Sequence, residues 1–566
     1  MSTPYLIDTR RLTGRTILLD GPGAVIETRP PPDIAVHLGA RWRREARHIA
    51  RALGWEDVEV ASRWFQPTLH LALTAPLDQL MVATHVAEWA WELALHGITE
   101  HVSPRRSRIV ARMQRRAEAA AQPGLEPFHR AALKARAQLI IGDGDLSVGE
   151  GAHASVFPFA DVPDSGSIDW LSKRHRIPVA LVTGTNGKTT TTRLLARMAK
   201  AAGFVAGHCC TDAVEVGDEV LDRDDYSGPG GARRVLRHPN CNFAVLEVAR
   251  GGMLRRGLTV RFADTAIVTN IGDDHLNDMG IHTKRQLAEV KFLVAKSLRP
   301  SGVLVTNADN EYCREQARRL SKPTAWFSLA SPTRSLLRGV NTRGVAYVED
   351  GVMTYQLGAR TIRVLPTDEL GMPGGGAARH NVANALAAMA AAIHLKLPLK
   401  AIRATLREFG RDRNDNRGRS NVYALRNGAK VLADFGHNPE SLSAVFATAR
   451  ALPHRRLLVS IGQAGDRDDA AIIALGQMAG AALPDRLLIK DMEKYLRGRA
   501  PGEIPALLAQ GARAAGLPED RIAFVGGDLA AWQSAEAWLQ DGDLAVMFVH
   551  SENEAVFAAI EAQTRT

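Results

Sequence analysis

The stretch Ile177-Pro-Val-Ala-Leu-Val-Thr-Gly-Thr-Asn-Gly-Lys-Thr-Thr-Thr-Thr192 decides the fold of this protein. Its apolar start predicts a buried strand over Ile177–Val182, and Thr189–Ala202 has the periodicity of a helix. A glycine turn between a strand and a helix presents backbone N–H groups and the positive helix end to an anion. We expect Gly184 and Gly187 to let the chain approach a phosphate closely.

The residues after this turn indicate a nucleotide. Lys188 would reach the β- and γ-phosphates, and the Thr189 hydroxyl would bind Mg²⁺. The spacing is shorter than the general GxxxxGK[ST] pattern, which would require glycine where Val182 stands. The prediction therefore depends on the whole TGTNGKTTTT segment and on its place between a strand and a helix.

Composition limits the class of protein. The chain has 566 residues, of which 45% are apolar and 23% charged. These values are typical of a globular protein with about three or four domains and exclude disorder throughout. The four cysteines form no CxxC pair, so we expect neither a disulfide scaffold nor a thiolate zinc site. The chain has neither a long apolar run nor the apolar core of a secretory signal, so we expect a cytoplasmic protein without a membrane span.

The charge indicates an anionic partner without specifying it. The formal net charge is +10, and the excess lies after residue 170. A basic surface attracts nucleic acid, nucleotides and acidic polymers alike. Aromatic residues make up only 5% and do not alternate with basic ones, so we do not expect nucleic acid as the main partner.

Changes of pattern divide the chain into residues 1–165, 166–410 and 411–566. The Pro- and Gly-containing segment Phe157–Gly166 is interpreted as a linker, and the polar segment Gly410–Ser420 as the second boundary. The first unit is mixed α/β, with strands predicted at Thr16–Leu19 and Ala24–Glu27 and helices at Ile34–Leu53, Leu77–Leu95 and Arg105–Ala121. The arginines of the last helix either contact an acidic ligand or form a solvated face.

The other two units alternate strands with helices, which predicts a parallel sheet with helices on both faces. In the second unit we expect strands at Phe243–Val248, Thr265–Val268 and Val303–Thr306, and helices at Asn381–Leu395 and Leu399–Phe409. In the third unit we expect strands at Lys430–Asp434, Arg456–Ile461, Arg486–Ile489 and Leu544–Val549.

Several motifs in residues 170–566 resemble those of one family. VTGTNGKTTTT, which ends at Thr192, resembles the ATP-binding signature of the Mur ligases. Further stretches are most similar to the Mur-like domain of cyanophycin synthetase, namely Ser227-Gly-Pro, Leu246-Glu-Val-Ala-Arg-Gly-Gly-Met-Leu-Arg255, Gly465-Asp-Arg and Leu496–Glu503. The resemblance implies an α/β, Mur-ligase-like three-domain architecture. A parallel-sheet central domain carries the phosphate loop, and a Rossmann-like domain follows it. The residues before residue 166 show no signature of the ATP-grasp domain that cyanophycin synthetase carries.

The resemblance also implies a metal site and a nucleotide site. Thr189, Glu247 and the His275 of Asn270-Ile-Gly-Asp-Asp-His would bind Mg²⁺, and Lys291 would be carbamylated beside the metal, unless it is an ordinary surface lysine. Asn381 would contact adenine, or else cap its helix. The residues implied to hold ATP are Gly184, Thr185, Asn186, Gly187, Lys188, Thr189, Thr190, Asn307, Asp309, Asn381, Arg417 (or Arg419), Asp434 and His437. Arg467 would stabilise charge in the transition state, and Lys188, Glu247, His275 and Lys291 complete the implied catalytic set.

The implied activity is ATP-dependent formation of an amide bond. A carboxylate would be activated as an acyl phosphate and joined to the amine of an amino acid. The resemblance favours an aspartyl carboxylate of a peptide or polymer and arginine or a related amino acid. It also implies a homo-oligomer and a partner of the ATP-grasp cyanophycin synthetase type. Two alternatives remain open at this point: a ligase for another small peptide or amino acid, and a non-catalytic ATP-binding subunit of a synthetase.

Overall fold

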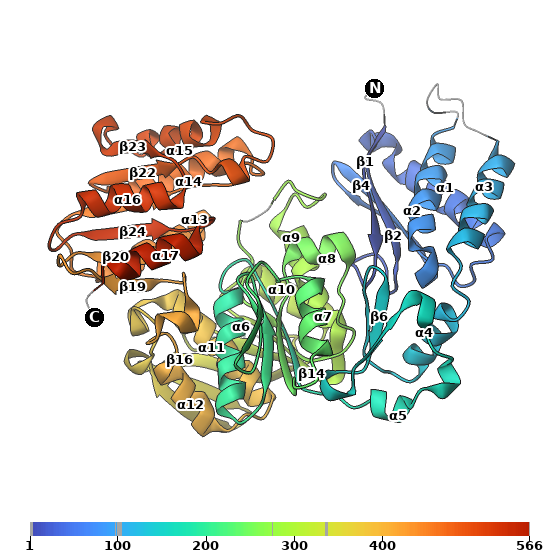
Figure 1. Cartoon of the computed structure of the whole chain (residues 1–566), viewed down its shortest axis with the longest axis horizontal. Helices are drawn as coiled ribbons and strands as arrows, with labels where there is room; N and C mark the ends of the chain where they lie inside the picture. Colours follow the sequence, from blue (N-terminus) through green and yellow to red (C-terminus); the bar gives the residue numbers. More distant parts are fainter. Residues whose placement is uncertain (1–3, 97, 99–104, 274–275, 334–337, 565–566) are drawn as a thin grey trace.

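The computed structural model describes residues 4–96, 98, 105–273, 276–333 and 338–564, which form three parts in a row (Figure 1). The N-terminal part lies at one end, the central part in the middle and the C-terminal part at the other end. None of the helices in these residues is long and apolar enough to cross a membrane.

The N-terminal part contains an antiparallel sheet in the order β1-β2-β4-β3, covered by three helices. Its elements are β1 (Tyr5–Leu12), β2 (Gly23–Arg29), β3 (Val60–Phe65), β4 (Thr68–Thr74), α1 (Pro32–Ala52), α2 (Leu80–Leu95) and α3 (Arg106–Ala120). Trp42 and Trp91 are buried between sheet and helices. The strand predicted at Thr16–Leu19 is wrong, because the Thr16 hydroxyl accepts hydrogen bonds from the N–H groups of Leu18 and Leu19 and closes a local turn.

A small sheet follows, formed by β5 (Leu139–Ile141), β6 (Asp145–Val148) and β7 (Ser155–Pro158), with α4 (Leu125–Lys134) beside it. The segment expected to be a linker begins inside β7. Phe157, Phe159 and Val162 pack against the apolar cluster around Phe128. The Pro and Gly residues of this segment therefore mark turns of an anchored chain, and the interpretation as a free linker is wrong.

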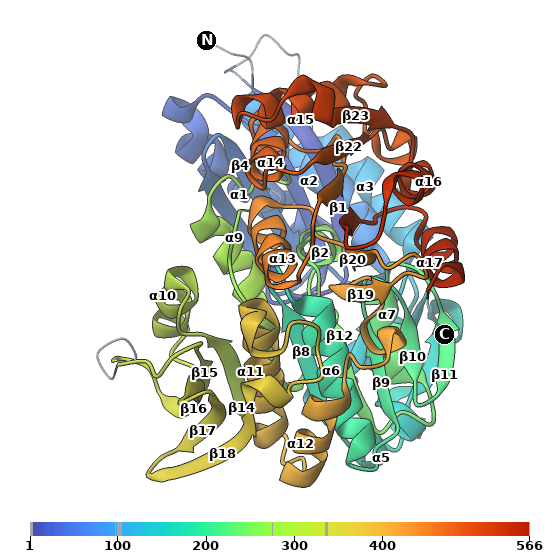
Figure 2. The same ribbon diagram turned by 90° about the vertical axis from the view of Figure 1, so that its left-hand side faces the viewer.

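The central sheet has eleven strands among the described residues, in the order β11-β10-β9-β12-β8-β13-β14-β15-β16-β17-β18 (Figure 2). The strands from β9 to β16 are parallel, and antiparallel strands extend both ends, so the sheet is mixed instead of wholly parallel. Their bounds are β8 Val179–Thr183, β9 Ala206–Cys209, β10 Val214–Val216, β11 Glu219–Asp222, β12 Phe243–Glu247, β13 Ala263–Val268, β14 Leu298–Asn307, β15 Thr324–Phe327, β16 Thr342–Glu349, β17 Val352–Leu357 and β18 Arg360–Pro366.

Helices cover both faces of the central sheet, as predicted. Alternate residues of β8 point to opposite faces, so Leu181 packs with α7, α9 and α10, whereas Ala180 packs with α6, α11 and α12. The bounds are α6 Lys188–Ala201, α7 Pro229–Arg237, α8 Arg250–Arg256, α9 Lys284–Lys291, α10 Glu311–Leu320, α11 Arg379–His394 and α12 Leu399–Glu408; the short α5 is Trp170–Lys173. The three strands and two helices predicted in the central part after the phosphate loop are confirmed to within a few residues, except that β14 begins five residues earlier.

The C-terminal part has a six-stranded sheet in the order β19-β20-β24-β21-β22-β23, parallel except for the β19–β20 pair. All four predicted strands are confirmed. The strands are β19 Asn421–Ala424, β20 Lys430–Asp434, β21 Leu457–Ile461, β22 Arg486–Lys490, β23 Ile522–Val525 and β24 Leu544–Phe548. Helices α13 (Pro439–Ala451), α14 (Asp469–Ala481) and α15 (Glu503–Ala514) cover one face, and α16 (Asp528–Trp538) and α17 (Asn553–Ala562) the other.

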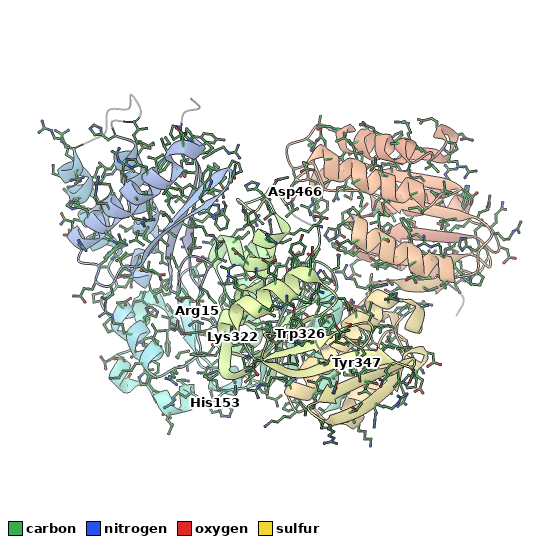
Figure 3. The ribbon with its side chains drawn as sticks, turned by 180° about the vertical axis from the view of Figure 1, so that it is seen from behind. Arg15, His153, Lys322, Trp326, Tyr347 and Asp466 are labelled. Atoms are coloured by element: carbon green, nitrogen blue, oxygen red, sulfur yellow. The ribbon has the colours of Figure 1, made fainter. Side chains whose placement is uncertain are left out.

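Backbone hydrogen bonds join the N-terminal part to the central part. Thr13 N–H donates to the Arg256 carbonyl (2.9 Å), and Leu258 N–H donates to the Arg15 carbonyl (2.7 Å). Arg15 is labelled at this junction in Figure 3. The contact continues at Gly280, which lies against His70 of β4. The N-terminal sheet is thus packed on the loop that precedes α9.

Replacing Gly280 by alanine is expected to destabilise the protein more than the same change at Gly351. Both glycines have a φ of +71°, so alanine incurs the same backbone cost of about 1–2 kcal/mol at either position. At Gly280 the added Cβ would also lie 2.0 Å from Nε2 of His70. A Cβ added at Gly351 would have no atom of the described residues within 4 Å. Thermal unfolding of the two variants measures the difference, and equal losses would contradict close packing of this loop on the N-terminal sheet.

Candidate active site

A cavity of about 1310 Å³ opens between the central and C-terminal parts. Its central wall lies at the carboxyl ends of β8, β12 and β13, where parallel sheets commonly bind ligands. Its other wall comes from loops that follow β20, β21, β22 and β24. Asp466, one of the lining residues, is labelled in Figure 3.

The phosphate loop forms the floor of this cavity, between β8 and α6. Gly187 has a φ of +83°, and a Cβ there would lie 2.0 Å from Oδ1 of Asn384, so both the turn and the packing require glycine. Asn270 fixes the loop from the next strand: its carbonyl accepts from Thr185 N–H (3.0 Å) and its side-chain oxygen from Asn186 N–H (2.9 Å). Asn270 thus holds two successive residues of the loop from outside it.

Glu247 ends β12, which pairs with β8, and lies beside the first turn of α6. Its carboxylate accepts hydrogen bonds from the hydroxyls of Thr189 (2.8 Å) and Thr211 (3.0 Å). Glu247 is only 1% exposed, and burial raises the pKa of its carboxyl group against the opposing effect of Lys188. A buried carboxylate beside two hydroxyls is a set of hard oxygen donors, which fits Mg²⁺.

Two lysines lie beside the loop. Lys188 Nζ donates to the Thr185 carbonyl (2.9 Å), and Lys291 Nζ donates to the Gly184 carbonyl (2.6 Å). Lys291 is 3% exposed at the end of α9, so the alternative of an ordinary surface lysine is wrong. The predicted ligand His275 lies outside the described residues.

The C-terminal wall contacts the phosphate loop directly. The Asn438 side-chain amide donates to Oδ1 of Asn186 (3.0 Å), and Asn438 also caps α13. Asp434 accepts hydrogen bonds from Ser420 and from Gly436 N–H (2.7 Å each), which ties the end of β20 to the two segments beside it.

The three arginines of interest differ in their partners. Arg417 pairs with Glu554 (3.0 Å) within the C-terminal part. Arg419 reaches across to Asp212 of the central part (3.3 Å), and Asp212 also pairs with Arg193 (3.2 Å). Arg467 lies 3.4 Å from the Asp466 carboxylate.

The structure brings most of the predicted residues to this one cavity. Those that line it are Thr185, Asn186, Gly187, Lys188, Thr189, Thr190, Glu247, Lys291, Asn381, Arg417, Asp434, His437 and Arg467. Gly184, Asn307 and Asp309 are not among the residues that line the cavity. Asn307 instead donates to the Thr269 carbonyl (3.1 Å), and Asp309 accepts from Ser328 (2.6 Å). Asn381 is the third residue of α11 and donates to the Pro373 carbonyl (3.1 Å), so the alternative that it caps this helix is wrong.

Sequence reasoning missed three residues of the site. Thr211 and Asp212 follow β9, a strand that was not predicted, and reach Glu247 and Arg419. Asn416 donates to the Thr190 hydroxyl (3.1 Å). The available signal for Thr211 and Asp212 was that this polar pair closely follows a short buried segment, Ala206–Cys209, as side chains at the end of a strand do.

Comparison with known proteins identifies two family regions. Residues 182–392 match the Mur ligase middle domain, and residues 418–548 match the Mur ligase, glutamate ligase domain. A cyanophycin synthetase from Trichormus variabilis is 38% identical over 337 residues, which are 59% of this chain and 37% of that protein. The chain thus spans well under half the length of this relative.

Two further relatives cover more of their own length. A UDP-N-acetylmuramate–L-alanine ligase from Xylella fastidiosa is 30% identical over 66% of this chain and 71% of that protein. The structure of a pseudomurein peptide ligase type C from Methanothermus fervidus aligns with a TM-score of 0.48 at 18% identity, over 68% of this chain and 79% of that one. By its two matched regions and its 30% identity to the Xylella fastidiosa ligase, the chain belongs to the Mur ligase family, whose members are ATP-dependent enzymes that join an acid to an amino acid.

Proposed function

We propose that this chain activates an aspartyl carboxylate of a peptide or polymer as an acyl phosphate and joins it to arginine or a related amino acid. The observation that carries the proposal is one cavity in which the phosphate loop and Glu247 face the C-terminal loops. The choice of substrates is supported by the segment Leu246–Arg255, which resembles cyanophycin synthetase, and by the 38% identity to such a synthetase.

The loop and its lysine would bind the ATP phosphates. The N–H groups at the start of α6 would attract the phosphate oxygens, and Lys188 would leave the Thr185 carbonyl to reach them. Asn307 would act indirectly, because it holds Thr269, whose hydroxyl donates to the Asn186 carbonyl (2.6 Å). Asp309 would help to orient Asn307, to whose side-chain oxygen its N–H donates (2.8 Å), and Asn381 and Thr190 would border the nucleotide.

Thr189, Glu247 and His275 would hold Mg²⁺, which offsets the charge that gathers as a carboxylate approaches the γ-phosphate. The fit is supported by the buried carboxylate and the two hydroxyls around it. Lys291, if carbamylated, would add a further carboxylate-like group to this side of the loop.

The reaction needs no covalent enzyme nucleophile. A substrate carboxylate oxygen attacks the γ-phosphorus and ADP leaves; the amine then attacks the acyl carbon, and phosphate and a proton leave. Arg467 would stabilise the negative charge that develops, while Arg417, Asp434 and His437 border the nucleotide from the C-terminal side. Contact of the two walls, as between Asn186 and Asn438, would exclude water from the acyl phosphate.

We further propose the division into residues 1–165, 166–410 and 411–566, with acceptor recognition in the first unit. By resemblance, the peptide backbone of the acceptor would come from a partner of the ATP-grasp cyanophycin synthetase type, and the chain would form a homo-oligomer.

A ligase for a different small peptide or amino acid is the second candidate, and the similarity to the Xylella fastidiosa ligase favours it. A non-catalytic subunit would keep nucleotide binding without turnover. It is the weaker alternative, because Lys188, Thr189, Glu247 and Lys291 all lie at the cavity.

The first test is phosphate release from Mg·ATP with each of the twenty amino acids, with and without short aspartyl peptides. We expect turnover only when an aspartyl peptide and arginine are both present, with a product mass that corresponds to a new amide. Turnover with another pair would replace the substrates and keep the ligase. ATP binding without turnover for any pair would contradict the proposal.

Replacing Thr189 by valine is expected to weaken Mg²⁺-dependent ATP binding by about tenfold or more, because a hydrogen bond to a buried carboxylate is lost. Thr192→Val is the matched control: Thr192 lies in the same helix and is buried, and its hydroxyl has no hydrogen-bond partner among the residues that the structure describes. Titration calorimetry with and without Mg²⁺ measures both variants. Equal affinities for the two variants would remove Thr189 from the metal site.

Lys291→Ala is expected to abolish turnover while ATP still binds. If the wild-type lysine is carbamylated, short carboxylic acids supplied in solution should restore part of the activity, because they replace the lost carboxylate. Lys296→Ala is the control, since this lysine bonds to Asp20 (2.8 Å) away from the cavity. Activity that is lost and not restored by any carboxylic acid would favour the ammonium form, which bonds to the Gly184 carbonyl.

A further inference from the structure

Three charged or titratable residues of the C-terminal part form a cluster that the proposed mechanism does not use. Lys490 ends β22, Asp528 begins α16, and His550 follows β24. Lys490 and Asp528 are each 1% exposed, and their charged groups lie 2.5 Å apart. Burying such a pair is costly unless every polar atom has a partner, so its presence calls for a role.

The three hydrogens of the Lys490 ammonium have three acceptors. They are Oδ1 of Asp528, the Phe548 carbonyl and Nδ1 of His550, the last at 3.4 Å. The second oxygen of Asp528 accepts from the backbone N–H of His550 (3.0 Å) and from the backbone N–H and the hydroxyl of Ser551 (2.7 and 2.8 Å). The pair therefore holds the segment that leaves β24.

This arrangement determines which ring nitrogen of His550 carries the hydrogen. An ammonium can only donate, so Nδ1 must accept, and in a neutral ring the hydrogen then resides on Nε2. Desolvation of the ring and the nearby Lys490 lower the pKa of His550 to about 3, so the imidazole is neutral near physiological pH. Nε2 is 3.1 Å from the Gly436 carbonyl and donates to it.

Gly436 belongs to the loop Asp434–His437, which lines the cavity. The Phe435 ring packs between the rings of His550 (5.4 Å) and His437 (5.5 Å) and under the guanidinium of Arg419 (4.4 Å). Arg419 in turn reaches Asp212 of the central part. A chain of contacts thus runs from the buried ion pair, through His550, to the wall that faces the phosphate loop.

We propose that Lys490 and Asp528 are positioning residues: they hold His550 as the Nε2–H tautomer, and His550 holds the 434–437 loop at the cavity wall. The effect on catalysis rests on the proposed function, since the loop must border the reacting groups. The structural part of the proposal does not depend on which substrates are used.

The first experiment compares His550→Phe with His550→Gln. Phenylalanine keeps the ring and loses both hydrogen bonds, whereas glutamine can donate to Gly436 and accept from Lys490. We expect His550→Phe to lower kcat/KM for the amino acid by about a hundredfold, as small misplacements in active sites do. His550→Gln should recover most of the activity. Wild-type kinetics in His550→Phe would overturn the proposal.

Asp528→Asn and Asp543→Asn form a matched pair that separates positioning from stability. Asp543 is also buried (2% exposed) and forms an ion pair with Arg456. It precedes β24 and therefore lies at the amino ends of the parallel strands, whereas Lys490 lies at their carboxyl ends. Both variants should unfold at lower temperature. Only Asp528→Asn should change the KM for the amino acid or kcat, and equal kinetic effects in both would reduce the cluster to a structural role.

The tautomer is measured without any substrate. Long-range nitrogen–proton NMR spectra are recorded for histidine-labelled wild-type protein and for His550→Phe. The signal that is missing in the variant belongs to His550. We expect the Nε2–H pattern near neutral pH; an Nδ1–H pattern or a protonated ring would overturn the proposal. If no amino acid supports turnover, the proposed function fails, and this spectrum still decides the positioning role.

Discussion

The hydrogen bond from the Thr189 hydroxyl to the Glu247 carboxylate joins the two elements on which the site depends. Thr189 is the second residue of α6 and Glu247 ends β12, and the two meet because β12 is the neighbour of β8 in the sheet. A carboxylate removed from water is costly unless it is hydrogen-bonded or paired, and the raised pKa of Glu247 expresses this cost. The hydroxyls of Thr189 and Thr211 offset it in part. A divalent cation beside the carboxylate would offset the remainder. The raised pKa of Glu247 and the proposed metal site would then both follow from the burial of this carboxylate.

The same order of strands decides what can approach this carboxylate. Because β13 lies on the other side of β8, Thr269 and Asn270 hold the phosphate loop from the flank opposite to Glu247. The open side then faces the C-terminal part, whose loops supply Asn438 and Arg419. The amide of Asn438 bonds to Asn186 in the loop itself, so the separation of the two walls is coupled to the conformation that receives phosphate. Movement of one part relative to the other would therefore change the loop as well as the volume of the cavity.

The sequence was most informative where burial dictates pattern. Strands such as β8 and β20 have buried apolar centres because helices cover both faces of their sheets, and they were predicted within two residues. The N-terminal sheet was harder: β1 is an exposed edge strand with the sequence YLIDTRRL, whose charged residues conceal it. In the site, the glycine turn and Glu247 could be found from motifs. The burial of Lys291 and the approach of Asp212 to Arg419 arise from contacts between segments 100–200 residues apart, for which no local pattern exists.

The distribution of charge shows why composition alone is a weak guide to the substrate. The chain has a net charge of +10, yet several arginines of the cavity bond to protein carboxylates. Arg193 and Arg419 share Asp212, Arg250 bonds to Asp278, and Arg417 bonds to Glu554. Each of these pairs cancels most of the field that its arginine would produce at a distance, especially at physiological salt. Recognition of the proposed acidic acceptor would therefore depend on individually placed side chains at the cavity, such as Lys188, and not on the overall charge of the protein.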